Sequence, residues 1–232
     1  FNFQFCPNLG LFYFCFLIMW RSVDNKNPFA ILAIINPPRV FLLVRNCAGF
    51  VYMNNRLFIL IDGSNFYHRL KELELAHLLT FNYAAFSKLL ARDTGAQTRR
   101  YYIAAVQVEK GNIKSEKLEK AQRKLLQQLV NSGWEYILGH MMKTDSLYHE
   151  KGVDVRIATD LLIGAYENLY DTAILVSSDT DLIPAIRQVR KIGKRVEYIG
   201  FQHKKSYGLM RNTDKYRLLK KEDIEKFIKT DC

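Results

Sequence analysis

The chain has 232 residues, of which 49% are hydrophobic and 25% are charged. These values are close to those of average globular domains, and they exclude a disordered chain, a collagen-like chain and a disulfide scaffold. The formal net charge of +11 and the sequence pI of about 9.4 favour a polyanionic partner, although charge alone does not separate RNA, DNA and anionic lipid.

The first 52 residues differ in composition from the rest of the chain. Residues 1–20 carry no charge, and three of the four cysteines lie within residues 1–52. We expect this hydrophobic leader to be upstream sequence read in frame, with translation starting at Met53. A membrane anchor, which needs roughly 20 apolar residues, and a structured extension are the alternatives.

Residues 53–232 contain a single cysteine, Cys232, and therefore no disulfide framework or cysteine-based zinc site. This composition fits a reducing cytoplasm, and the five histidines show no metal-ligand spacing. We expect a cytoplasmic domain over residues 53–232 without membrane association. The oligomeric state stays open, and a homo-oligomer is one of the options.

Strand-like and helix-like segments alternate along residues 53–232. Short apolar runs predict strands at 57–61, 99–106, 134–138, 172–177, 195–199 and 216–219. Amphipathic spacing predicts helices at 66–79, 83–91, 113–131, 153–170, 182–191 and 221–229. Residues 140–151 are interpreted as a polar loop. The alternation predicts a three-layer, Rossmann-like α/β fold with a mostly parallel sheet of five to six strands.

Four aspartates occupy positions where such a sheet would place a functional site. Asp62 directly follows the first predicted strand, Asp179 and Asp181 follow the fourth, and Asp154 begins the helix before that fourth strand. Ligands of α/β sheets bind beyond the carboxyl ends of the strands. If the first and fourth strands are neighbours, we expect the four carboxylates to converge at this edge.

A cluster of carboxylates repels itself and needs protons or cations at neutral pH. Oxygen ligands without cysteine or histidine suit a hard ion such as Mg²⁺ or Mn²⁺, which can assist phosphodiester hydrolysis. Asn65 and Ser177 are candidates for orienting the acids or bound water. Asp160 is a weaker candidate for this outer role, because it lies roughly 120° around the helix from Asp154. Its alternative role is to support the helix or pair with a nearby base.

Each of these acids also has a structural explanation. An Asp-Gly pair after a strand commonly forms a turn, and acids before a helix cap its first N–H groups. The combination of acids after two core strands is harder to explain by turns and caps, and it favours a functional cluster. No P-loop, dinucleotide-binding glycine motif or serine nucleophile elbow occurs in the chain.

The acids lie in three stretches, residues 58–67, 150–155 and 175–182, and residues 206–209 with Asp214 form a fourth pattern. In order and spacing these stretches resemble the NYN domain family, a branch of the PIN-like metal-dependent nucleases, and its LabA-like group in particular. The resemblance covers about residues 57–222. It implies a PIN-like fold, a Mg²⁺ or Mn²⁺ site, and cleavage or processing of RNA. By position, its acidic site would consist of Asp62, Asp154, Asp179 and Asp181.

Basic residues form two groups that could meet a polyanion. The group on the 113–131 helix alternates with glutamates, which indicates a solvated helix face. The group after the last acidic stretch has few acids nearby. From this second group our candidates for contacts with RNA phosphates are Arg187, Arg190 and Lys194.

The function we expect is that of a cytoplasmic ribonuclease that uses Mg²⁺ or Mn²⁺ to cleave RNA. A nonhydrolytic RNA-binding or regulatory protein on the same fold is the first alternative. A metal-dependent phosphatase that acts on small phosphate esters is the second. The sequence leaves the RNA target and the cleavage mode open.

Overall fold

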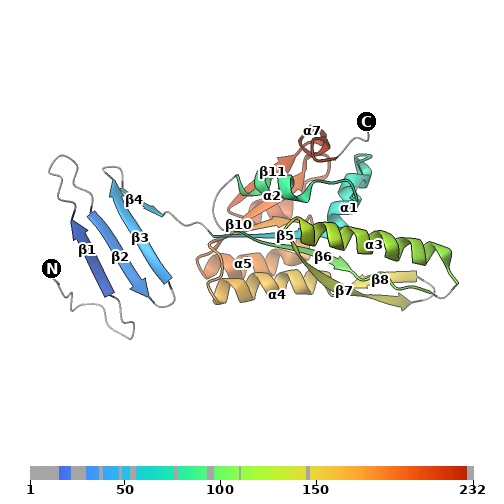
Figure 1. The fold of residues 1–232 in the computed structure, drawn as a ribbon, viewed down its shortest axis with the longest axis horizontal. Helices are drawn as coiled ribbons and strands as arrows, with labels where there is room; N and C mark the ends of the chain where they lie inside the picture. Colours follow the sequence, from blue (N-terminus) through green and yellow to red (C-terminus); the bar gives the residue numbers. More distant parts are fainter. Residues whose placement is uncertain are drawn as a thin grey trace. The chain divides into compact units, whose positions relative to one another are not determined.

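Figure 1 shows a computed structural model of the chain. The structure describes residues 16–21, 30–36, 39–46, 49–52, 56–75, 78–92, 97–109, 111–144 and 147–228. The chain divides into two compact units, Phe1–Asn54 and Asn55–Cys232, and each is described here by itself. Met53, at which we predict that translation starts, lies outside the described residues.

The described residues of the first unit form a four-stranded antiparallel sheet. Its strands pair in chain order and are β1 (Phe16–Arg21), β2 (Ala30–Asn36), β3 (Arg39–Asn46) and β4 (Gly49–Tyr52). Most of β2 and the middle of β3 are apolar and include several β-branched residues, a composition that suits strands. In the described part of the chain, no helix has the length and apolar character needed to cross a membrane.

The second unit is built on a seven-stranded sheet in the order β11-β10-β9-β5-β6-β7-β8. All neighbours are parallel except β8, which runs antiparallel to β7. The strands are β5 (Leu57–Asp62), β6 (Gln97–Ala104), β7 (Glu135–Thr144), β8 (Leu147–Lys151), β9 (Thr172–Val176), β10 (Arg195–Phe201) and β11 (Lys215–Leu219). The predicted α/β fold with a mostly parallel sheet is therefore confirmed, with β8 as an additional strand.

Helices cover both faces of this sheet and make it a three-layer structure (Figure 1). One face packs against α1 (Gly63–Glu72), α2 (Tyr83–Ala91), α3 (Ile113–Asn131) and α7 (Lys221–Glu225). The other packs against α4 (Val153–Tyr166), α5 (Ile183–Lys191) and α6 (Tyr207–Asn212). All six residues of the central strand β5 are buried, and alternate residues enter the two cores. A strand buried on both faces must be apolar throughout, which explains the continuous run that predicted it.

Local capping explains why two helices begin where the sequence predicts. Asn82 caps α2 by accepting the N–H of Ala85, and Asn112 caps α3 by accepting the N–H groups of Lys114 and Ser115. The observed bounds of α3 equal the predicted ones.

Three predicted helices end earlier in the structure. The helix predicted at 66–79 is α1, which begins at Gly63 and ends at Glu72, before Glu74 adopts a left-handed backbone with φ 60°. The helix predicted at 153–170 ends at Tyr166, two residues before Asn168 with φ 54°. Left-handed residues cannot continue an α-helix, and their side chains do not reveal this conformation in the sequence. The terminal helix α7 ends at Glu225, and residue 229 of its predicted range lies outside the described residues.

The prediction of a polar loop at 140–151 is wrong. β7 continues to Thr144, and it pairs with β8 from His140 opposite Lys151 to Thr144 opposite Leu147. β8 is the edge strand of the sheet, and an edge strand tolerates the polar composition that suggested a loop. The sequence pattern did not predict α6, which Ser206 caps by accepting the N–H of Leu209.

Candidate functional site

The two central strands bring the first and last acidic stretches together. β5 and β9 are parallel neighbours, and the last register pair joins Ile61 to Val176. Asp62 follows Ile61 and Ser177 follows Val176, so these two residues reach the carboxyl edge of the sheet side by side. The condition on which the convergence of the acids was expected, that these two strands are neighbours, is therefore met.

Asp62 is held by hydrogen bonds on both of its carboxylate oxygens. Asp62 is buried, with only 4% of the residue exposed. The Ser177 hydroxyl donates to Oδ2 at 2.9 Å, and the backbone N–H of Asn65 donates to Oδ1 at 3.0 Å, which makes Asp62 the N-cap of α1. A carboxylate oxygen can accept more than one hydrogen bond, so the capping role does not by itself exclude a second role for Asp62.

Asp179 joins the same network through the Ser177 hydroxyl. The backbone N–H of Asp179 donates to Ser177 Oγ at 3.1 Å, and Asp179 Oδ1 accepts the N–H of Asp181 at 2.9 Å. Asp179 thereby caps the short helix η1 (Thr180–Leu182). The Ser177 hydroxyl therefore links the Asp62 carboxylate to the backbone that positions Asp179.

Asn65 fixes the loop on the other side of Ser177. Its Oδ1 accepts hydrogen bonds from the Ser178 N–H at 3.2 Å and from the Ser178 hydroxyl at 3.0 Å. The contacts of Asn65 and Ser177 are those that an orienting role requires, and this role stays a prediction.

Asp154 lies on the first turn of α4 and is exposed. α4 packs against η1, the helix that carries Asp181. Within the described ranges, no group of three His, Cys, Asp or Glu side chains is arranged to hold a metal ion. The structure thus joins Asp62, Asp179 and Asp181 through hydrogen bonds, whereas the convergence of all four aspartates on one ion stays a prediction.

Asp160 belongs to a different part of α4. Its Oδ2 accepts hydrogen bonds from Tyr102 at 2.9 Å and from Arg100 at 3.1 Å, and Arg156 lies 3.6 Å from Oδ1. Burial and the neighbouring Asp160 carboxylate raise the pKa of Tyr102 far above its ordinary value, so the phenol donates the hydrogen bond. Of the two roles considered for Asp160, these contacts match pairing with a nearby base.

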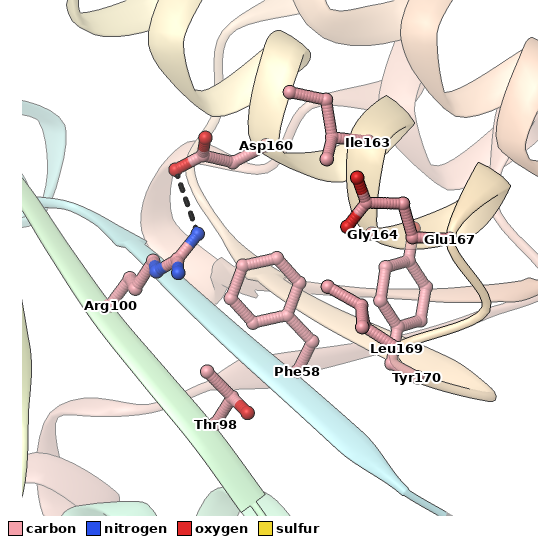
Figure 2. Close-up of a pocket in the computed structure, with 9 residues that line it drawn as sticks. All are labelled: Phe58, Thr98, Arg100, Asp160, Ile163, Gly164, Glu167, Leu169 and Tyr170. Carbon is pink, nitrogen blue, oxygen red and sulfur yellow. Dashed lines mark hydrogen bonds and ion pairs between the residues drawn. The ribbon is translucent and has the colours of Figure 1, made fainter. Parts of the chain in front are cut away.

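Asp160 and its ion-pair partner Arg100 line a cavity of about 190 Å³ between α4 and the sheet, shown in Figure 2. Arg100 lies above the ring of Phe58, and its guanidinium carbon is 5.3 Å from the ring centroid. Phe58 comes four residues before Asp62 on β5, which corresponds to about 13 Å along an extended strand. The cavity therefore lies away from the carboxyl edge.

The predicted phosphate-contacting residues lie on α5 and in the turn after it. Arg187 donates to Asn212 Oδ1 at 2.8 Å, and Arg190 forms an ion pair with Asp214 at 2.9 Å. Lys194 contacts Asn168 and Asp171, and Asp171 directly precedes β9. Lys194 therefore lies at the amino edge of the sheet, opposite Asp62 and Asp179. Its predicted contact with RNA is not tested by these positions.

Asp171 forms an ion-paired group at this amino edge. Arg56, which precedes β5, donates to both of its carboxylate oxygens at 2.6 and 3.0 Å. Partial burial raises the pKa of Asp171, but the hydrogen bonds from Arg56 and the charge of Lys194 outweigh this effect and bring the pKa to about 2.

The carboxyl edge carries a further group, which we call the Glu72 cluster: Arg69, Glu72, His203 and Lys204. Arg69 Nη1 donates to both Glu72 carboxylate oxygens at 2.8 Å, His203 Nε2 lies 2.9 Å from Oε2, and Lys204 Nζ donates to Oε1 at 3.3 Å. Hydrogen bonds from Arg69, His203 and Lys204 lower the pKa of Glu72 to about 2. This cluster was not predicted from the sequence, where its one local signal is the spacing of Arg69 and Glu72 on one helix.

A largely apolar groove of about 430 Å³ opens beside Asp62. Its lining includes Gly63 and Ser64, which follow Asp62 at the start of α1, and the exposed side chains of Tyr67, Leu79 and Leu118. The candidate site thus combines acids at the carboxyl edge of the sheet, the basic side chains of the Glu72 cluster, and an apolar groove.

Comparisons with known proteins agree with this architecture. A search of curated proteins gave no match. Among solved structures, the chain is similar to a protein of unknown function from Vibrio parahaemolyticus, with a TM-score of 0.53 and 20% sequence identity over 73% of this chain and 95% of the other. This likeness shows the fold. The NYN domain matches residues 56–220, which include the sheet from β5 to β11 and every candidate residue of the site. The chain therefore belongs to the NYN domain family.

Proposed function

We propose that this protein is a metal-dependent ribonuclease that cleaves RNA phosphodiester bonds at the carboxyl edge of its central sheet. The observation that carries the proposal is the network in which the Ser177 hydroxyl joins the Asp62 carboxylate to Asp179 at the ends of neighbouring strands. Membership of the NYN family supports a nuclease-type function related to RNA. In this proposal the enzyme acts in the cytoplasm and belongs to the LabA-like group.

The side chains at the edge have the chemistry that a Mg²⁺ or Mn²⁺ ion requires. The candidates Asp62, Asp154, Asp179 and Asp181 offer oxygen donors only, which hard divalent cations prefer. Mg²⁺ commonly binds one or two carboxylates and completes its coordination with water and substrate phosphates. Asp62 and Asp179, which one hydroxyl links, fit such a sparse site better than a cage built only of protein groups.

The chain's own residues would prepare this edge for a phosphodiester. Asp62 and Asp179 would hold the cation, and Ser177 would keep their positions fixed while the substrate enters. A bound divalent cation would supply a more acidic water molecule and neutralise charge on the phosphate. The apolar groove beside Asp62 would hold bases of the strand, since exposed aromatic side chains stack on bases of any sequence.

The test is cleavage of single-stranded and structured RNA by the full chain in Mn²⁺, in Mg²⁺ and in EDTA. We expect cleavage with either cation and none with EDTA. Asp62→Asn and Asp179→Asn should each abolish cleavage and keep the fold, because Asn caps a helix as well as Asp but carries no charge. Asp223→Asn on α7 is the matched control and should cleave at the parental rate.

Two outcomes would contradict the proposal. Undiminished cleavage by the Asp62→Asn/Asp179→Asn double variant would rule out the acid site. RNA binding without cleavage under every condition would favour the nonhydrolytic alternative, and turnover of small phosphate esters without RNA cleavage would favour the phosphatase.

A further inference from the structure

We propose that the Glu72 cluster binds a phosphate of the RNA backbone that neighbours the phosphate held at Asp62 and Asp179. This inference rests on the proposed function and names the surface that holds the strand. One carboxylate faces an arginine, a lysine and a histidine in the cluster. The cluster therefore keeps positive charge after its internal ion pairs are counted, as a site for a phosphate requires.

Donor groups in the cluster remain for a ligand. Arg69 uses Nη1 for Glu72 and Nε for Ser178, and its Nη2 carries two further N–H donors. The Lys204 side chain is 62% exposed, and its ammonium group has three donors. The Arg69 Nη2 donors and the exposed Lys204 ammonium group can form charge-assisted hydrogen bonds with phosphate oxygens.

The cluster lies directly beside the acids. Arg69 Nε donates to the Ser178 hydroxyl at 3.3 Å, and the preceding residue, Ser177, binds Asp62. His203 and Lys204 come from η2 (Gln202–Lys204), which follows β10, the neighbour of β9 in the sheet. Three consecutive strand ends thus place the acids and the basic cluster next to each other along one edge.

The other basic candidates are less suited to a phosphate at this edge. Lys194 lies at the opposite edge. Arg190 pairs with Asp214, which directly precedes β11 at that same amino edge, and Arg187 contacts Asn212 at the end of α6. Glu72 has two effects in the cluster. Its ion pairs hold the basic side chains in place before the RNA strand binds. It also competes with the phosphate for their donors, which makes its removal informative.

The experiment measures binding of a fluorescent single-stranded RNA to the full chain carrying Asp179→Asn, which prevents cleavage, between about 50 and 200 mM salt. His203→Gln/Lys204→Gln should weaken binding roughly 5- to 10-fold at the low end and flatten the salt slope by about 0.7, the value for one phosphate on a single strand. The matched control is Lys117→Gln/Lys120→Gln, two exposed lysines of α3, and it should bind as the parent does. Lys204→Gln alone tests the same point if the double variant folds poorly.

Glu72→Gln separates phosphate binding from a role in tying η2 to α1. A phosphate site should bind RNA more tightly without its competing carboxylate, whereas a purely structural ion pair would lose thermal stability with no gain in affinity. The second result would overturn the inference. Unchanged affinity in the His203→Gln/Lys204→Gln variant, or equal losses in that variant and the α3 control, would also overturn it.

Cleavage by the chain with Asp179 intact distinguishes failure of this inference from failure of the proposed function. Metal-dependent cleavage together with unchanged binding in the cluster variant would defeat the phosphate site alone. Absence of both RNA binding and cleavage would defeat the two together.

Discussion

Ser177 is the side chain through which the two halves of the candidate site meet. Ser177 is only 3% exposed, and its hydroxyl donates one hydrogen bond and accepts another. A buried hydroxyl with both functions in use orients its partners, and its loss deprives the buried Asp62 carboxylate and the part-buried Asp179 N–H of that hydrogen bond.

Ser177→Ala should therefore affect stability and cleavage together. We expect a loss of about 1–3 kcal/mol in the free energy of unfolding, because Asp62 Oδ2 and the Asp179 N–H each lose a buried partner. RNA cleavage should fall by at least about tenfold, since a misplaced catalytic group costs one or two orders of magnitude. Urea unfolding and initial cleavage rates measure the two effects.

Ser87→Ala is the control for this substitution. Ser87 is also buried, and its hydroxyl donates to the Ala84 carbonyl in α2. Its replacement should lower stability without changing the cleavage rate of the folded protein. If both variants cleave alike, Ser177 has only a structural role.

At the residue scale, the sequence identified acids that act as caps and still occupy the expected edge. Asp62 caps α1 and Asp179 caps η1, so the structural explanation for each acid is true. Capping does not exclude a second role, because a carboxylate oxygen accepts more than one hydrogen bond. The Glu72 cluster escaped prediction because Glu72 and His203 are 131 residues apart in the chain. Contacts of this kind depend on strand order, which the sequence pattern alone does not supply.

At the scale of elements, the helices and strands that burial determines were predicted more accurately than the residues at which helices end. The apolar run of β5 and the spacing of α3 reflect burial, and both were placed within one residue. The ends of α1 and α4 depend on left-handed backbone at Glu74 and Asn168, which residue type does not determine. β8 was missed because polar residues suit both an edge strand and a loop.

The junction of β5 and α1 depends on close packing against β6. A Cβ atom at Gly63 would lie 2.3 Å from Tyr101 Cε1 and 2.7 Å from the Tyr102 carbonyl oxygen. Both distances are shorter than van der Waals contact, and the backbone oxygen cannot rotate away. The glycine after Asp62 therefore allows the start of α1 to approach the neighbouring strand.

Gly63→Ala should lower the free energy of unfolding by about 2–3 kcal/mol, the upper part of the range for overpacking. The comparison variant is Gly152→Ala, where φ is 82° and the added carbon would meet no atom within 4 Å beyond its immediate neighbours along the chain. It should cost about 1 kcal/mol through backbone strain alone. Thermal melting followed by circular dichroism measures both, and equal costs would contradict the packing explanation.

At the scale of the whole molecule, the second unit contains the complete seven-stranded sheet and all of the candidate residues. Residues 53–232 should therefore express as a folded protein with the same RNA cleavage rate as the full chain. The measurement compares circular dichroism, melting and cleavage for the two proteins. Insolubility of the shorter protein, or partition of the full chain into membranes, would show that residues 1–52 have a role that we have not assigned to them.

The two edges of the sheet formed by the parallel strands carry different side chains. Arg56, Asp171 and Lys194 join strand beginnings at the amino edge, whereas Asp62, Ser177 and Asp179 end or follow strands at the carboxyl edge. Such a division lets the loops of one edge diverge during evolution while ion pairs at the other keep the strands in register. Under the proposed function, a descendant of this protein could acquire a new substrate by altering the residues after β5, β9 and β10 and still inherit the same scaffold. For the engineer, the carboxyl edge is the place to randomise and the amino edge the place to leave untouched.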